Sequence, residues 1–347
     1  MITDVLKQYD IRLNPNSLKP YGNGLINSTY TIESDTDCYI LQRINNQVFK
    51  QPQQLSHNLN VLSGHLQTHH PEYFLPLPIR NMTEDSHSYA ENGDCFRLTK
   101  FVAGSQVVDV VADSNQAYQA ALQFGQFTRI FSALDANQLQ ITIPQFHDLS
   151  YRFQQFGAAL ATASGQRLAS SATLTQQLLK HANIANTYQQ LVLQSAISLR
   201  TTHHDTKISN VLFNQANKGL CVIDLDTVMA GYFISDVGDM MRTYLCPEPE
   251  SSTNWNAIHV RLNMYEAIAD GYLTGIGNNL SENERAYFGY AGAFMIYMQA
   301  LRFATDHLMN DVYYGATYPN ENLMRAKNQL LLLEAYLDMQ REQKGQK

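Results

Sequence analysis

Hydrophobic and polar positions change their period near the end of the first hundred residues. Before that point, YGNGLINSTYTIES (21–34), DCYILQRIN (37–45) and DCFRLTKFV (94–102) carry β-branched or aromatic runs bounded by Gly, Asn and Asp, which predicts strands. Between the second and third segments, leucines recur at helical spacing and predict one amphipathic helix: Leu55, Leu59, Leu62 and Leu66. We therefore expect a small sheet with one helix in this part.

After residue 103 the pattern becomes mainly helical. DSNQAYQAALQFGQFTRIFSAL (113–134) is apolar at a period of 3.6, and Asp113 or Ser114 is its expected N-cap. Further helices are predicted near 171–198, 254–275, 283–307 and 321–341. The clear interruption is a β-hairpin, in which NVLF (210–213) and LCVID (220–224) flank the turn segment NQANKG (214–219).

Together these patterns predict an α+β fold with two lobes. A small sheet-plus-helix N-lobe would span residues 1–102 and a larger, mostly helical C-lobe residues 103–347, with the boundary at FVAG (101–104). The length of 347 residues is enough for two such lobes. A cleft between a sheet and helices suits a nucleotide.

Charge and hydropathy exclude two classes of function. The net charge of −7 is spread without a basic stripe, so we expect no nucleic-acid partner. The longest apolar runs are too short to span a membrane, and MITDVLKQYD at the start does not resemble a secretory leader. The expectation is a cytoplasmic protein, either a monomer or a weak homo-oligomer.

Polar residues gather around the predicted hairpin, in THHDTKISNVLFNQANKGLCVIDLDTV (202–228). Charged and amide groups beside buried strands are costly unless they are paired or functional. Asp205 precedes a strand, so its carboxylate can point into a cleft, orient an attacking hydroxyl and accept its proton. The hairpin would bring Asn210 and Asp224 side by side, as two hard oxygen ligands for Mg²⁺.

The segment HHDTKISN matches the protein-kinase catalytic-loop pattern His-x-Asp-x-Lys-x-x-Asn. With VIDLDTV after it, the chain resembles the aminoglycoside-phosphotransferase-like branch of the protein-kinase-like superfamily, and within it the N-acetylhexosamine 1-kinases. The similarity covers roughly residues 20 to 335. Four further stretches carry it: YILQRINNQVFKQP (39–52), AYQAALQFGQFTRIFSAL (117–134), SDVGDMMR (235–242) and LRFATDHLMNDVYYG (301–315).

The resemblance implies a role for each matching residue. Asp205 would be the catalytic base, His203 would structure the loop, and Lys207 would contact the transferring phosphate. Asn210 and Asp224 would bind Mg²⁺. The sugar pocket would include Asp205, Arg302 and Tyr313, although aromatic packing explains the last two equally well.

These roles imply an ATP- and Mg²⁺-dependent kinase acting on the anomeric hydroxyl of N-acetylglucosamine or N-acetylgalactosamine. The product would be an α-linked sugar 1-phosphate. An aminoglycoside, choline or another sugar remains an alternative acceptor within the same fold.

The nucleotide site is less completely matched. YGNGLINSTY (21–30) resembles a Gly-rich phosphate loop. The expected nucleotide contacts are Gly22, Gly24, Asn27, Ser28, Thr29, Arg43, Phe101 and Val102. The third-strand lysine of kinases is missing, and Gln42 and Arg43 stand there instead. Strand alternation puts only one of these two on the cleft face, so either Arg43 replaces the lysine or Lys207 carries the charge.

Two rival functions remain open from the sequence. VIDLDTV also fits an aspartyl-phosphate phosphatase, with Asp224 as nucleophile and Asp226 as acid, but that fold would need alternating strands after residue 240. Alternatively, the chain is an inactive nucleotide-binding module. Asp226, Asp236 and Asp239 are interpreted as structural support for the site, and a zinc site at His203, His204 and Asp205 would need further ligands.

Overall fold

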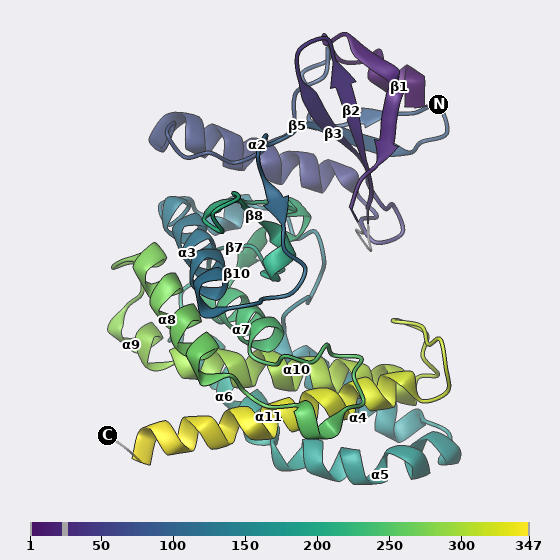
Figure 1. Ribbon diagram of the computed structural model, residues 1–347. Coiled ribbons are helices and arrows are strands. Elements are labelled where there is room, and N and C mark those ends of the chain that lie inside the picture. Colours follow the sequence, from purple (N-terminus) through teal and green to yellow (C-terminus); the bar gives the residue numbers. More distant parts are fainter. Residues whose placement is uncertain (1, 23–26, 346–347) are drawn as a thin grey trace.

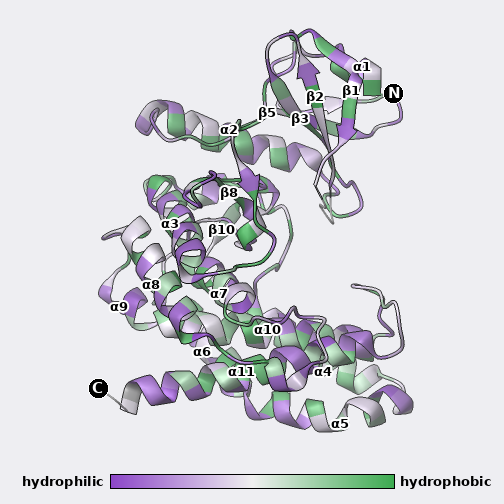
Figure 2. Ribbon diagram, in the orientation of Figure 1, coloured by the Kyte–Doolittle hydropathy of each residue, from purple (hydrophilic) through white to green (hydrophobic). Residues whose placement is uncertain are grey.

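The computed structural model describes residues 2–22 and 27–345 (Figure 1). Its N-terminal region is a five-stranded antiparallel sheet in the order β1-β2-β3-β5-β4, preceded by the short helix α1 (Ile2–Leu6). The strands are β1 (Leu13–Pro20), β2 (Ser28–Ser34), β3 (Cys38–Arg43), β4 (Ser88–Tyr89) and β5 (Cys95–Lys100). The sheet mixes hydrophobic and hydrophilic residues (Figure 2), as expected when its two faces have different surroundings.

The register of the sheet sets which side chains share a face. Thr29 on β2 pairs with Gln42 on β3, and Gln42 pairs in turn with Arg97 on β5. Directly opposite residues in an antiparallel sheet point to the same face, so these three side chains form a row. Their sequence neighbours Ser28 and Arg43 also pair with each other, and alternation places them on the opposite face.

Helix α2 (Pro52–His69) confirms the predicted leucine stripe, whose first member, Leu55, packs with Cys95 of β5. Leu59, Leu62 and Leu66 belong to the large core that is built mainly from C-terminal helices, whereas the sheet and α1 have a smaller core of their own. The amide nitrogen of Asn58 donates to the carbonyl of Val228, and also to that of residue 140, each at 2.9 Å. In Figure 1, α2 lies between the sheet and the helical region.

The C-terminal region is mainly helical, as expected. Its helices are α3 (Ser114–Ile130), α4 (Leu149–Thr162), α5 (Gly165–Lys180), α6 (Ala182–Leu193), α7 (Phe233–Tyr244), α8 (Leu262–Ile276), α9 (Glu282–Ala286), α10 (Phe288–Leu308) and α11 (Glu321–Gly345). Asp113 caps α3 by accepting the Gln116 N–H at 2.9 Å. The single helix expected over 171–198 is instead two helices that meet at His181.

Short strands and single turns position the polar residues around the predicted hairpin. The hairpin consists of β8 (Val211–Phe213) and β9 (Gly219–Val222), and β6 (Gln106–Val107) pairs with β8. A second, unexpected sheet joins β7 (Arg200–Thr202) to β10 (Met229–Gly231). The 3₁₀ turns are η1 (Ala136–Gln138), η2 (Ile208–Asn210), η3 (Leu225–Thr227) and η4 (Trp255–Ala257).

The structure confirms the α+β architecture, with an antiparallel sheet before a helical region. Between residues 241 and 345 the described chain carries helices and turns and no strand, which contradicts the alternating pattern that a phosphatase would need. Among the described helices, none has the length and apolar character required to cross a bilayer.

Candidate active site

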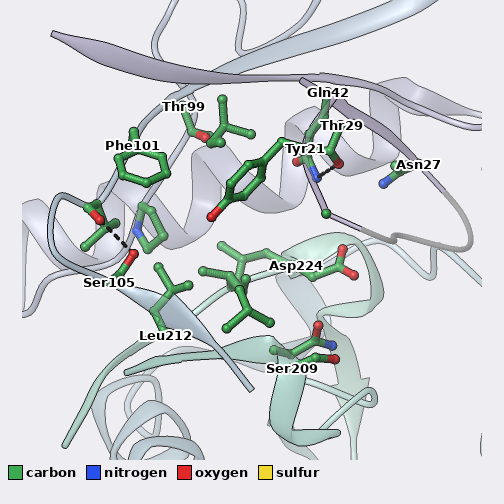
Figure 3. A pocket seen from close by; sticks show the side chains of 18 of the residues that line it. Tyr21, Asn27, Thr29, Gln42, Thr99, Phe101, Ser105, Ser209, Leu212 and Asp224 are labelled. Atoms are coloured by element: carbon green, nitrogen blue, oxygen red, sulfur yellow. Dashed lines mark hydrogen bonds between the residues drawn. The ribbon is translucent and has the colours of Figure 1, made fainter. Parts of the chain in front are cut away.

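A cavity of about 490 Å³ lies between the sheet and the hairpin (Figure 3). Thr29 and Gln42 line it from the sheet, and a hydrogen bond of 3.2 Å from the Gln42 amide to the Thr29 hydroxyl joins them. Leu212 and Asp224 line it from the hairpin side. Phe101, from the segment between the two regions, lies at a third side. The cavity is therefore walled by both regions of the chain.

His203 supports the loop between β7 and η2 from inside the protein. Its ring is fully buried and makes T-shaped contacts with Phe124 and Phe127, at centroid distances of 5.2 and 5.8 Å. Nε2 lies 3.0 Å from the carbonyl oxygen of Ile223, which can only accept, so Nε2 carries the proton. Burial lowers the pKa of His203, and the neutral imidazole thus ties the loop to the end of β9.

Asp205 is half-buried and forms an ion pair with Lys207, whose Nζ donates to its Oδ2 at 2.8 Å. Burial alone would raise the pKa of Asp205, but the Lys207 charge and hydrogen bond outweigh it and lower the pKa. The amide nitrogen of Asn210 donates to the backbone carbonyl of Asp205 at 2.8 Å. The loop therefore presents an ionised carboxylate that is paired with Lys207, on a backbone that Asn210 holds.

Asn210 and Asp224 lie next to each other and both line the cavity. The Ile223 N–H donates to the backbone carbonyl of Asn210 at 2.8 Å, which brings the residue before Asp224 against Asn210. Asp224 has a left-handed backbone, with φ of 61°, where β9 ends. Burial, together with the carboxylates of Asp226 and Asp205, raises the pKa of Asp224 to about 6. A cation here would relieve that crowding of negative charge.

Two acids of α7 hold the backbone of the loop. The Asp236 carboxylate accepts the N–H groups of His203 and His204 at 3.0 and 2.8 Å. Asp239 accepts the Thr206 N–H at 2.9 Å and also pairs with Arg242. Burial raises the pKa of Asp236 to about 7, and the two backbone N–H groups oppose that rise. Both acids contact the loop backbone, as expected for structural support.

The structure separates the expected nucleotide contacts into two sets. Gly22, Asn27, Thr29, Phe101 and Val102 line the cavity. Gly24 lies outside the described residues.

Ser28 and Arg43 form the second set, on the other face of the sheet. Arg43 pairs there with Asp94 at 3.5 Å, so it is not placed to substitute for the missing lysine. The cavity receives Gln42 from β3 instead.

One charged residue in the cavity wall, Arg97, was not assigned a nucleotide contact from the sequence. Arg97 lines the cavity beside Gln42 and forms a buried ion pair with Asp226. Asp226 also accepts a hydrogen bond of 2.7 Å from the side-chain amide of Asn27. Strand alternation in DCFRLTKFV was the available signal for Arg97, but it does not say which face of the strand lines the cavity. That face follows from the pairing of β5 with β3, which the sequence of a single strand does not specify.

A second cavity, of about 480 Å³, contains Arg302 and Tyr313, two of the three residues expected to bind the sugar, but Asp205 does not line it. The Arg302 guanidinium lies 5.8 Å from the ring centre of Tyr313 and 5.5 Å from those of Tyr314 and Phe146. Arg152 also lines this cavity. The structure therefore brings Arg302 and Tyr313 together, in a cavity separate from the one that Asn210 and Asp224 line.

A row of rings connects this second cavity to the loop between β7 and η2. Phe146, which contacts Arg302, stacks on His147 at 4.4 Å between ring centres. His147 in turn lies 5.2 Å from the ring of His204, the residue before Asp205. The second cavity is thus adjacent to the loop that carries the predicted base.

Residues 17–277 match the sequence profile of the APH phosphotransferase enzyme family. This match covers well over half of the chain. The chain belongs to this family. The hairpin and the loop between β7 and η2 lie within the matched residues, and so do all the residues that line the first cavity.

Solved structures share the fold of this phosphotransferase at low sequence identity. An aminoglycoside phosphotransferase from Alicyclobacillus acidocaldarius subsp. acidocaldarius DSM 446 is 15% identical, with a TM-score of 0.68 over 98% of this chain and 95% of that one. A microcompartment-associated aminopropanol kinase is 15% identical, with a TM-score of 0.64 and 97% of each chain covered. The amicoumacin kinase hAmiN, in complex with AMP-PNP, Ca²⁺ and Ami, is 14% identical, with a TM-score of 0.62 and 96% of each chain covered.

The donor set of this phosphotransferase fits a hard divalent cation. An amide oxygen and a carboxylate are ligands that Mg²⁺ accepts, and the Asn210 amide nitrogen is already committed to Asp205. Within residues 2–22 and 27–345, no group of three or more His, Cys, Asp or Glu is arranged to hold a metal. A cation at Asn210 and Asp224 would therefore need phosphate and water oxygens to complete its coordination, as Mg²⁺ commonly does.

Proposed function

We propose that this phosphotransferase is an ATP- and Mg²⁺-dependent kinase that phosphorylates the anomeric hydroxyl of N-acetylglucosamine or N-acetylgalactosamine. ATP would occupy the cavity between the sheet and the hairpin. The sugar would occupy the second cavity, at Arg302 and Tyr313. The similar amicoumacin kinase structure contains AMP-PNP, a triphosphate analogue, which supports ATP as the phosphate donor.

In the proposed reaction, Asp205 accepts the proton of the anomeric hydroxyl as its oxygen attacks the γ-phosphorus. The new O–P bond forms while the bond between the γ-phosphorus and the β,γ-bridging oxygen breaks, and ADP leaves. Lys207 keeps Asp205 ionised before the reaction and adds positive charge beside the phosphates. Asn210 and Asp224 would hold Mg²⁺, which when bound neutralises charge on the β- and γ-phosphates. An anomeric hydroxyl is more acidic than an ordinary alcohol, so a carboxylate suffices as its base.

The two guanidinium groups of the second cavity support a neutral sugar as the acceptor. Arg152 and Arg302 both line it, and burial together with the charge of Arg302 lowers the pKa of Arg152. Asp306 also lines the cavity, but its carboxylate already accepts the backbone N–H groups of Tyr313 and Tyr314 at 2.7 and 2.9 Å. The guanidinium groups of Arg152 and Arg302 can only donate hydrogen bonds, and the Asp306 carboxylate already has its partners. The cavity therefore favours a ligand that offers hydroxyl and acetamido oxygens as acceptors.

The same geometry argues against the two cationic acceptors. An aminoglycoside carries several ammonium groups and would meet Arg152 and Arg302. Choline needs open aromatic faces, but in this cavity the Arg302 guanidinium already lies over Tyr313 and Tyr314.

The function is tested by measuring ADP release with Mg·ATP across a panel of acceptors. The panel contains N-acetylglucosamine, N-acetylgalactosamine, glucosamine, glucose, choline and an aminoglycoside, and Asp205→Asn is the control variant. We expect release with the N-acetylhexosamines and loss of at least about a hundredfold in kcat for Asp205→Asn. Phosphorus NMR of the product should show phosphate on the anomeric oxygen.

Two results would replace this proposal. ADP release with choline or the aminoglycoside, but not with the sugars, would move the acceptor to a different hydroxyl compound. Nucleotide binding without release for any acceptor would favour the inactive binding module.

A further inference from the structure

We infer that Arg97 provides the phosphate-binding cation that a third-strand lysine supplies in other kinases, and that Asp226 is its positioning residue. The inference rests on the proposed nucleotide in the first cavity. In protein kinases the lysine lies on the third strand and its acidic partner on the N-terminal helix. Here the cation would lie on the neighbouring strand β5, and its acidic partner in the segment after the hairpin.

The position of Arg97 follows from the sheet register. Arg97 pairs with Gln42, which occupies the cavity face of β3. Its Nε donates to the Gln42 side-chain oxygen at 2.9 Å, so the two side chains lie together in the cavity wall. Arg97 therefore projects from the neighbouring strand β5, on the same face of the sheet as Gln42 of β3.

Asp226, from the η3 turn after the hairpin, fixes the guanidinium. Arg97 donates to both carboxylate oxygens of Asp226, with its Nη2 at 3.3 Å from Oδ2. The side-chain amide of Asn27 donates to the same Oδ2 at 2.7 Å. Arg97 and Asp226 are 4% and 2% exposed, so neither side chain is free to turn toward solvent. A buried bidentate pair of this kind is geometrically specific.

The pair leaves Arg97 with donors for a ligand. A guanidinium has five N–H groups, and three of them are used by Gln42 and Asp226 among the described residues. Arg97 lines the same cavity as the predicted metal ligand Asp224, where the phosphates of a nucleotide would be expected. Burial disfavours the charged form of Arg97, but the carboxylates of Asp226 and Asp224 raise its pKa.

The other cations near this cavity are less suited to the task. Arg43 pairs with Asp94 on the outer face of the sheet. Lys100 lines the cavity, but its Nζ pairs with Asp37 at 2.7 Å and its side chain is 65% exposed. Lys207 already pairs with Asp205. Arg97 is the buried cation that the sheet directs into the cavity.

A binding experiment separates a phosphate contact from a structural role. Calorimetry with Mg·ADP and with adenosine gives, for each protein, the ratio of the two affinities. A role that only stabilises the fold or joins the two regions changes both affinities together, whereas a phosphate contact changes the ADP affinity alone. Arg97→Met combined with Asp226→Asn removes both charges, so no buried carboxylate is left unpaired. Arg97→Lys keeps the cation, and Arg43→Met removes a cation of the same sheet from the outer face.

We expect the double variant to lose about tenfold or more in ADP affinity while its adenosine affinity stays within about twofold of the wild type. Arg97→Lys should recover part of that loss, and Arg43→Met should bind both ligands as the wild type does. An unchanged ratio of ADP to adenosine affinity in the double variant would overturn the assignment of Arg97. A wild-type protein that binds neither ligand would overturn the proposed nucleotide site, and this inference with it.

Discussion

Asp236 binds the backbone of His204, whose N–H donates to the Asp236 carboxylate at 2.8 Å. His204 has a left-handed backbone with φ of 67°, a conformation that a non-glycine residue adopts at a cost. The bond from Asp236 therefore stabilises a turn that would otherwise relax, and the next residue is Asp205. The position of Asp205, the predicted base, therefore depends on Asp236, which takes no part in the proposed reaction.

Asp236→Asn should lower kcat by about tenfold or more, because the amide group presents an N–H where a backbone N–H must be accepted. The KM for ATP should change little, since Asp236 contacts the loop backbone. Steady-state kinetics measures both constants. Asp270→Asn, an exposed change of the same type on α8, is the matched control. A kcat equal to that of the wild type would show that the loop holds its shape without Asp236.

Asp224→Asn should raise the Mg²⁺ concentration needed for half-maximal activity by about tenfold or more, because a neutral amide is a weaker ligand than a carboxylate. The measurement is a Mg²⁺ titration at saturating ATP and acceptor. Asp35→Asn, on the exposed turn between β2 and β3, serves as the control. An unchanged Mg²⁺ requirement in Asp224→Asn would remove this residue from the predicted metal site.

Replacing each of two helical glycines by alanine should change the free energy of unfolding in opposite directions. A Cβ at Gly238 in α7 would lie 2.3 Å from the Ala291 carbonyl oxygen in α10, so Gly238→Ala should destabilise the fold by about 2 kcal/mol. A Cβ at Gly64 in α2 meets nothing within 4 Å. Gly64→Ala should therefore stabilise by up to about 1 kcal/mol through helix propensity. Denaturant unfolding measures both, and a destabilised Gly64→Ala would contradict this account of the packing.

The stability of the protein should fall as the pH falls below about 6.5, partly because of His87. Burial, reinforced by the Arg97 charge, lowers the pKa of His87 to about 4, although Asp226 and Asp85 oppose the shift. The unfolded chain takes up a proton at its usual pKa near 6.5, whereas the folded chain does not until about pH 4. The stability from neutral His87 is thus complete above about 6.5 and declines toward pH 4, by about 1.4 kcal/mol per pH unit.

Denaturant unfolding at pH 7 and pH 5 tests this dependence. His87→Gln should unfold with a smaller difference between the two pH values, because glutamine does not titrate. His259→Gln changes an exposed histidine and should keep the wild-type difference. Equal pH dependence in His87→Gln and wild type would mean that other groups account for all of it.

The sequence predicted the parts of the structure that depend on local patterns. The leucine stripe of α2, the Asp113 cap of α3 and the hairpin around NQANKG each arise from residues close together in the chain. The sheet of β7 and β10 was missed because three-residue strands carry too little periodicity to detect. The break at His181 was missed because no Gly or Pro marks it.

In the candidate site, the residues that are distant in sequence were the hardest to place. The pattern in 203–224 named the loop and hairpin residues, since they lie within one short segment. The contact between Asn27 and Asp226 joins residues that are 199 positions apart. Likewise, the cavity-facing cation became visible only through the pairing of Arg97 with Gln42, because each strand alone allows either face.

The packing of α2 decides which elements of this protein are held together. In protein kinases, the positioning of the N-terminal helix controls activity. Here Leu59 and Leu62 are buried in the larger core, and Asn58 is bonded to the backbone beside β10, so α2 is anchored with the hairpin. Strand β6 is anchored there too, by its pairing with β8. The sheet is tied to the same group of elements, because Arg97 pairs with Asp226 after the hairpin and Ser56 of α2 bonds to His87 beside β4. Sheet, helix and hairpin thus brace one another around the cavity.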